Sequence, residues 1–78
     1  MERIRSNDDL VTFIRSLRAD LIEKPDTWEN PTLERFLEAL AAWTEAMDGY
    51  YRNTGQEIPK QPSWKVVGDM LMAAKMYE

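Results

Sequence analysis

The chain has no cysteine and no histidine among its 78 residues. Without cysteine it cannot form a disulfide or use a thiolate, which suits a reducing compartment. Without histidine, neither the usual zinc sites nor the usual activation of a serine nucleophile can be built, because both depend on imidazole. The sequence therefore predicts no metal site, no cofactor, no catalytic residue and no small-molecule substrate, and we do not expect an enzyme.

Long apolar runs are also missing. No stretch approaches the ~18 consecutive apolar residues of a membrane-spanning helix. The opening residues 1–5 are not followed by the apolar region of a signal peptide. We expect a cytoplasmic protein without a membrane segment. We also expect one small helical domain over residues 1–78, because the length lies below the commonest domain size of ~100–150 residues.

Helical periodicity is the main pattern that the chain does contain. Apolar residues recur at spacings of three and four, and no segment alternates as a strand would. The stripes are Leu10, Phe13, Ile14, Leu17 and Leu21; then Leu33, Phe36, Leu37, Leu40, Trp43 and Met47; then Trp64, Val67, Leu71, Ala74 and Tyr77. They predict helices at about 7–23, 31–53 and 64–77. Three helices of this kind, joined by short connections, indicate an all-α three-helix up-down-up bundle.

Local signals set the expected ends of the second and third helices. Asn30 and Pro31 indicate the start of the second helix, as a side-chain cap followed by proline at the first helical position. Gly49 interrupts the apolar pattern, but the stripe continues in register through Tyr50 and Tyr51. We therefore expect one continuous second helix, since an interior glycine costs only about 1 kcal/mol relative to alanine. Ser63 is placed to cap the third helix.

The tryptophans are expected to be structural for the most part. Trp43 lies in the middle of the second stripe and Trp64 begins the third, so we predict that both belong to the core. The register leaves Trp28 and Tyr51 open between core and surface. We expect Trp28, which falls in the first connection, to fold back as a lid.

The third helix carries the main functional prediction. Ten of the 14 residues from Trp64 to Tyr77 are apolar. A helix that is apolar nearly all round should be buried nearly all round, yet a three-helix bundle covers only about half of it. We therefore predict an exposed apolar patch at Val66, Met72 and Met76, since methionine is common at adaptable binding surfaces. The patch favours a non-catalytic protein-interaction domain that binds another protein or itself as a homodimer. The alternative for the two methionines is that they merely border the core.

The second hypothesis is a nucleic-acid-associated regulator. It depends on a candidate patch for an anionic partner near the N-terminus, made of Arg3, Arg5, Arg15 and Arg18. Acidic neighbours dilute this patch, and the net charge of −4 weakly repels phosphate backbones. The connection before the third helix, at about nine residues, is also longer than the turn of a helix-turn-helix protein. Nucleic acid is therefore the less favoured partner.

A set of short motifs runs from residue 28 to the end of the chain. It comprises Trp28-Glu29-Asn30, Leu33, Phe36-Leu37, Trp43, Asp48-Gly49-Tyr50-Tyr51, Asn53, Pro62-Ser63-Trp64, Ala73-Ala74 and Tyr77-Glu78. In this set the chain resembles a family of short, uncharacterised bacterial proteins, a domain of unknown function. The resemblance covers about two-thirds of the chain. It implies a small all-helical fold and supplies no activity, substrate or catalytic residue.

Overall fold

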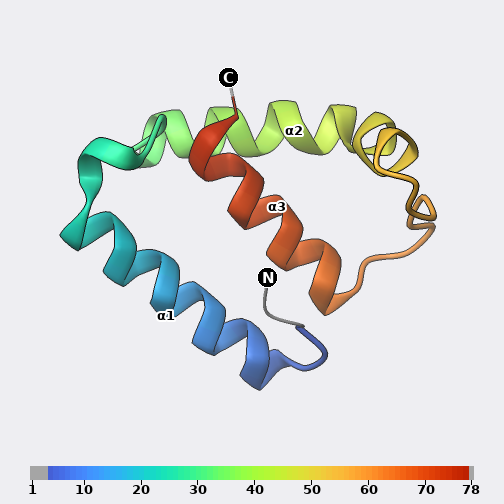
Figure 1. The fold of residues 1–78 in the computed structure, drawn as a ribbon, viewed down its shortest axis with the longest axis horizontal. Helices are drawn as coiled ribbons and strands as arrows, with labels where there is room; N and C mark the ends of the chain where they lie inside the picture. Colours follow the sequence, from blue (N-terminus) through green and yellow to red (C-terminus); the bar gives the residue numbers. More distant parts are fainter. Residues whose placement is uncertain (1–3, 78) are drawn as a thin grey trace.

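Three α-helices and one short 3-10 helix make up the computed structural model, which describes residues 4–77 (Figure 1). In chain order they are α1 (Asn7–Glu23), η1 (Pro25–Thr27), α2 (Leu33–Asn53) and α3 (Trp64–Met76). Within residues 4–77 there is no strand. The expected all-α, three-helix fold is confirmed.

The first and third helices begin where their caps predict. The Ser6 side chain accepts a hydrogen bond from the backbone N–H of Asp9 at 3.1 Å. The Ser63 side chain accepts one from the N–H of Val66 at 3.1 Å. Each cap satisfies a backbone donor that the first turn of a helix cannot use. The bounds of α1 agree with the prediction, and α3 ends one residue earlier than expected.

The second helix starts later than predicted but is continuous. Thr32, and not Asn30, is the N-cap, and its side chain accepts from the N–H of Arg35 at 3.3 Å. The helix passes through Gly49, where a Cβ atom would meet nothing within 4 Å. It ends before Gly55, whose φ of 72° is the left-handed conformation that favours glycine after a helix. The prediction of one long helix is confirmed, and the predicted start at residue 31 is wrong by two residues.

The helices form a flattened arrangement in which α3 lies between the other two (Figure 1). α1 and α3 run in the same direction and α2 runs the opposite way, as an up-down-up order requires. α3 packs against both neighbours, whereas no pair of Cα atoms from α1 and α2 comes within 8 Å. The radius of gyration is 12.6 Å, compared with about 11.5 Å for a compact chain of this length. The molecule is therefore open on the side between α1 and α2.

The core consists of apolar side chains on both sides of α3. Ile4, Leu10 and Phe13 form a buried cluster, and Leu71 of α3 packs against it. Ile4 approaches Gly68 so closely that a Cβ atom there would collide with the Ile4 side chain. The other buried apolar side chains are Trp28, Ala39, Trp43, Tyr51, Val66 and Ala74.

Burial confirms some of the aromatic assignments and corrects others. Trp43 is 5% exposed, and Trp28 and Tyr51, which the register left open, are buried as well. The prediction for Trp64 is wrong, because it is 47% exposed. Trp64 belongs to the first turn of α3 and lines a hollow with Ile4 and Pro62 instead of lying between helices.

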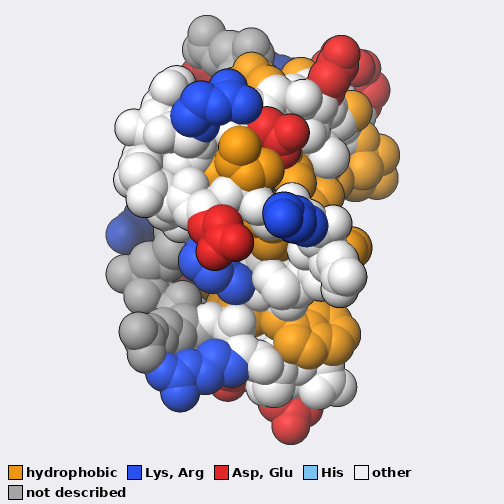
Figure 2. Space-filling view, turned by 90° about the vertical axis from the view of Figure 1, so that its right-hand side faces the viewer, with side chains coloured by type: hydrophobic (Ala, Val, Ile, Leu, Met, Phe, Trp, Pro, Cys, Tyr) orange, Lys and Arg blue, Asp and Glu red, His pale blue; other side chains and the backbone are white. Residues whose placement is uncertain are grey.

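Several residues of the predicted stripes are also exposed. Ile14 of α1 is 44% exposed, and Leu33 and Leu37 of α2 are 73% and 52% exposed. Ile14 and Leu33 line the space between α1 and α2 and stay exposed because these two helices do not pack against each other. Figure 2 shows the end of the molecule where α2 ends and α3 begins. Charged side chains of both signs are interspersed there, and hydrophobic side chains gather toward the right-hand edge of the view.

Candidate functional site

A groove separates α1 from the first turns of α2, and we call it the α1–α2 groove. Its volume is about 310 Å³. Ile14 and Leu21 line it from α1, and Leu33 and Phe36 line it from α2. Leu71 of α3, the helix between them, also lines the groove. The lining is therefore apolar on all three helices, although the groove is open to solvent.

The groove exists because two helices have wider apolar faces than α3 can cover. On α1, Leu10 and Phe13 are buried and Ile14, one position further round the helix, is not. On α2, Ala39 and Trp43 are buried, whereas Leu33 is 73% exposed. An apolar arc of this width normally meets two neighbours. Here each of the two helices has only one α-helix packed against it, so the side of the arc that faces the groove stays uncovered.

Trp28 lines one part of the groove and is held by both α1 and α3. Its indole Nε1 donates to Asp20 Oδ2 at 2.7 Å, and Lys75 Nζ donates to the same oxygen at 2.8 Å. Lys75 Nζ also lies 5.4 Å from the centre of the Trp28 ring, and that ring stacks on Phe36 at 6.1 Å. The hydrogen bonds from Lys75 and then Trp28 lower the pKa of Asp20 below its usual range. Trp28, Asp20 and Lys75 thus form a hydrogen-bonded junction that holds the Trp28 side chain in place at the groove.

Asn30 belongs to the same junction and does a different job from the one predicted. Its Nδ2 donates to the carbonyl oxygens of Ala74 at 3.0 Å and Tyr77 at 2.7 Å. Its backbone N–H donates to the carbonyl of Lys75 at 3.1 Å. Asn30 therefore satisfies carbonyl groups that the end of α3 leaves without helical partners. Asn30, which was expected to cap α2, therefore binds the C-terminal end of α3 instead. Thr32 caps α2.

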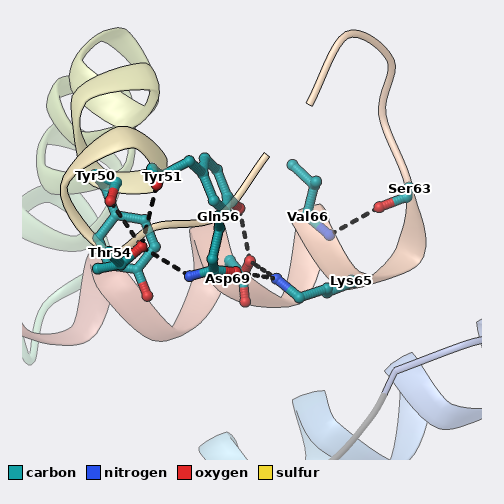
Figure 3. Close-up of polar contacts among 8 residues, drawn as sticks. All are labelled: Tyr50, Tyr51, Thr54, Gln56, Ser63, Lys65, Val66 and Asp69. Atoms are coloured by element: carbon teal, nitrogen blue, oxygen red, sulfur yellow. Dashed lines mark hydrogen bonds and ion pairs between the residues drawn. The ribbon is translucent and has the colours of Figure 1, made fainter. Parts of the chain in front are cut away.

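A second polar cluster joins the end of α2 to the start of α3 (Figure 3). The Tyr51 hydroxyl donates to Asp69 Oδ2 at 2.6 Å, and Lys65 Nζ donates to the same oxygen at 2.8 Å. Tyr51 is 1% exposed and Asp69 is 8% exposed. Burial, together with the hydrogen bond to Asp69, raises the pKa of Tyr51 above its ordinary value. The hydroxyl therefore stays protonated near neutral pH, and the cluster fastens two helices together.

The three residues proposed as a patch on α3 fall in different surroundings. Val66 is 6% exposed, so the prediction that it belongs to an exposed patch is wrong. The reason is that α3 is the central helix and has a neighbour on each side. Met72 is half-buried against the Leu10 and Phe13 cluster, and Met76 is 54% exposed. The two methionines share a hollow of about 320 Å³, whose lining includes Trp43 and Tyr50 of α2. Binding at this hollow stays a prediction.

The arginines proposed for an anionic partner do not form one site. Arg3 lies outside the described residues. Arg5, Arg15 and Arg18 are exposed, but Arg5 lines the hollow beside Trp64, whereas Arg18 lines the α1–α2 groove. The structure thus separates Arg5 from Arg18. It also places Arg18 in an apolar setting that the sequence pattern did not reveal.

Within residues 4–77, no group of three or more acidic side chains is arranged to hold a metal ion. No helix there combines the length and the apolar character needed to cross a membrane.

Comparison with known proteins assigns a family but no activity. A family model described as a family of unknown function (DUF7660) matches residues 6–78. The match includes all three helices, and therefore every residue of the groove. No curated protein and no solved structure matches the chain.

Proposed function

The chain belongs to the family of unknown function DUF7660, and we propose that it is a non-catalytic protein-interaction domain whose docking surface is the α1–α2 groove. The observation that supports this most directly is Leu33. It is a large apolar side chain, 73% exposed, beside a groove lined with other apolar side chains. This surface differs from the one expected on α3, where Val66 is buried.

Exposed apolar surface of this kind is costly unless something covers it. Fully burying a leucine side chain contributes about 1.5–3 kcal/mol. Contiguous apolar patches on soluble domains commonly mark binding sites. The groove lies between two helices and has Leu71 between its walls, a shape that suits a helix with an apolar face. A helical segment of a protein is therefore the occupant that fits it best.

The non-catalytic part of the proposal is supported by the chemistry of the chain. It has no cysteine or histidine to act as nucleophile or base near neutral pH. Its most buried polar groups, Tyr51 and Asp69, are hydrogen-bonded to each other and to Lys65. Groups that satisfy one another in this way have a structural explanation.

The cellular setting is part of the proposal as well. We place the domain in the bacterial cytoplasm, which is supported by the absence of cysteine and by the resemblance to short bacterial proteins. A nucleic-acid role through the arginines stays an untested alternative. Binding to a polyanion that weakens steeply with salt would favour it.

Site-specific photo-crosslinking in the producing cells tests the docking surface. A benzoylphenylalanine residue is introduced at Leu33 and, as the matched control, at Glu57 in the exposed loop between α2 and α3. We expect protein adducts from position 33 and none from position 57. If neither position 33 nor position 14 on the opposite wall yields an adduct, the groove is not a docking surface.

A further inference from the structure

The two ends of α1 are attached to α3 by different kinds of contact. Toward its start, Leu10 and Phe13 are buried in an apolar cluster, and side chains of α3 pack against that cluster. Leu17 is the last α1 side chain that packs against it. None of residues 18–27 is buried. We call residues 18–23, the part of α1 beyond the cluster, the α1 arm. The arm therefore lacks the buried apolar side chains that hold the start of the helix.

Asp20 is the residue that joins the α1 arm to α3. Its Oδ2 accepts from Lys75 Nζ at 2.8 Å and from Trp28 Nε1 at 2.7 Å. Within residues 4–77, the contact with Lys75 is the only hydrogen bond or ion pair between α1 and α3. The Lys75 and Asp20 side chains are 20% and 31% exposed, so water reaches the pair. Such a pair stabilises a structure less than the burial of two large apolar side chains does.

α2 and α3 are joined near both ends of their contact, and α1 takes no part in either junction. At one end, the buried Tyr51 hydroxyl donates to the buried Asp69 carboxylate at 2.6 Å (Figure 3). At the other end, Asn30 donates to the carbonyl oxygens of Ala74 and Tyr77. These hydrogen bonds do not depend on the α1 arm, so they can persist when the arm leaves α3.

From this difference we propose that the α1 arm, together with residues 24–27, is a movable wall of the α1–α2 groove that opens by local unfolding, and that Asp20 is its latch. Segments with few buried apolar contacts are the ones that open locally. Arg18 and Leu21 of the arm line the groove, so opening widens the groove at that end. Opening also takes the hydrogen-bond acceptor away from the Trp28 indole. The motion belongs to the protein alone and so goes beyond the proposed function.

Native-state hydrogen exchange of the purified protein, followed by NMR, measures the opening without any partner. We expect the amide N–H of Leu21 in the arm to exchange at least ~10-fold faster than that of Trp43 after correction for intrinsic rates. Trp43 is buried in the middle of α2, so its amide requires unfolding of the whole protein. The indole N–H of Trp28 should exchange together with the arm, because Asp20 is its partner.

Two variants separate local opening from global unfolding. Lys75→Met breaks the latch, which is also broken in the unfolded protein, so the protection of Leu21 and of Trp43 should fall by the same factor, about 2–5-fold. Tyr51→Phe removes a contact that persists when only the arm opens. It should lower the protection of Trp43 about 5–30-fold and leave that of Leu21 unchanged. Lys60→Met, at an exposed lysine of the loop before α3, is the matched control and should change neither.

Three results would overturn the movable wall. Equal protection of Leu21 and Trp43 in the wild type would mean that the arm opens only when the whole protein unfolds. The same conclusion would follow if Tyr51→Phe lowered the protection of both amides equally. If Lys75→Met left Leu21 unchanged, the end of α1 would fray without releasing Asp20. The photo-crosslink at position 33 reports on the docking surface separately, so failure of either test leaves the other in place.

Discussion

The two sides of α3 differ in how completely they are closed. Toward the end of α2, Tyr51 is 1% exposed, and its hydroxyl is fixed on Asp69. Toward the groove, Leu33 of the same helix is 73% exposed although it lies on a similar apolar face. An amphipathic stripe thus becomes core only where another helix packs against it. Along α2, that condition holds at Tyr51 and fails at Leu33.

Truncating Trp43, on the closed side of α3, should lower the free energy of unfolding more than any other change proposed here. Trp43 is 5% exposed and contacts the rings of both Tyr50 and Tyr51. Truncating a buried aromatic side chain costs ~3–5 kcal/mol, and small domains have as little as about 5 kcal/mol in total. We expect Trp43→Ala to be largely unfolded at 37 °C, as measured by thermal and urea denaturation. Trp64→Ala is the matched control, and with Trp64 47% exposed it should cost much less. Equal losses of stability from the two variants would mean that Trp43 is no more important to the core than the half-exposed Trp64.

Removing the hydrogen bonds that Asn30 makes to the end of α3 should cause the next largest loss of stability. Asn30→Ala leaves the carbonyl groups of Ala74 and Tyr77 without their side-chain donor. Losing a buried hydrogen bond in this way costs about 1–3 kcal/mol. The midpoint of urea denaturation should fall accordingly. Asn53→Ala, at the exposed end of α2, is the control and should change stability by less than ~0.5 kcal/mol.

Tyr51→Phe tests the hydrogen bond between the Tyr51 hydroxyl and Asp69 without creating a cavity. It removes the hydrogen bond to Asp69 and leaves only Lys65 on that carboxylate. We expect a loss of about 1–2 kcal/mol near neutral pH, measured by urea denaturation. A Phe variant as stable as the parent would mean that the hydroxyl adds no net stability and that Tyr51 contributes only through the packing of its ring.

The same substitution makes a prediction about alkaline pH. The folded pKa of Tyr51 is raised above the ordinary value of 10.0, so the unfolded state releases this proton first. Stability should therefore be present below pH 10 and fall as the pH rises above it. Tyr51→Phe should remove that part of the decline. The difference between the two stability profiles above pH 10 is the measurement, because it cancels the other titrating groups.

The smallest expected effect compares two glycines within helices. Gly49→Ala meets open space in the middle of α2 and should stabilise the protein by ~0.5–1 kcal/mol. Gly68→Ala has the same helical benefit on α3, but the new methyl group would collide with Ile4. It should therefore stabilise less than Gly49→Ala, or destabilise, in parallel thermal melts. The reverse order would mean that Ile4 is not held against α3.

Local signals predicted much of this fold because they act within a few residues. The caps at Ser6 and Ser63 set the start of two helices, and the stripe through Trp43 identified a buried aromatic. The passage of α2 through Gly49 followed from the same periodicity. These inferences needed no knowledge of how the helices cross.

The candidate site could not be predicted in the same way. Asn30 has the sequence signature of a helix cap, yet its donors serve carbonyl groups more than 40 positions away in the chain. Val66 was expected at the surface because third helices in closed bundles are half covered. The nearest sequence signal for the groove is the width of the apolar faces of α1 and α2, which the periodicity alone assigns to the core.

By itself, the amino-acid sequence determined three helices, most of their ends, the family and the lack of cysteine and histidine chemistry. Only the tertiary structure decided that α3 is the central helix and that α1 and α2 stay apart. The physical reason is that periodicity defines which side chains share a face, whereas the crossing of helices defines which faces meet. Most of the apolar residues of α3 are therefore covered by its two neighbours, and the apolar surface that stays exposed at the groove lies on α1 and α2.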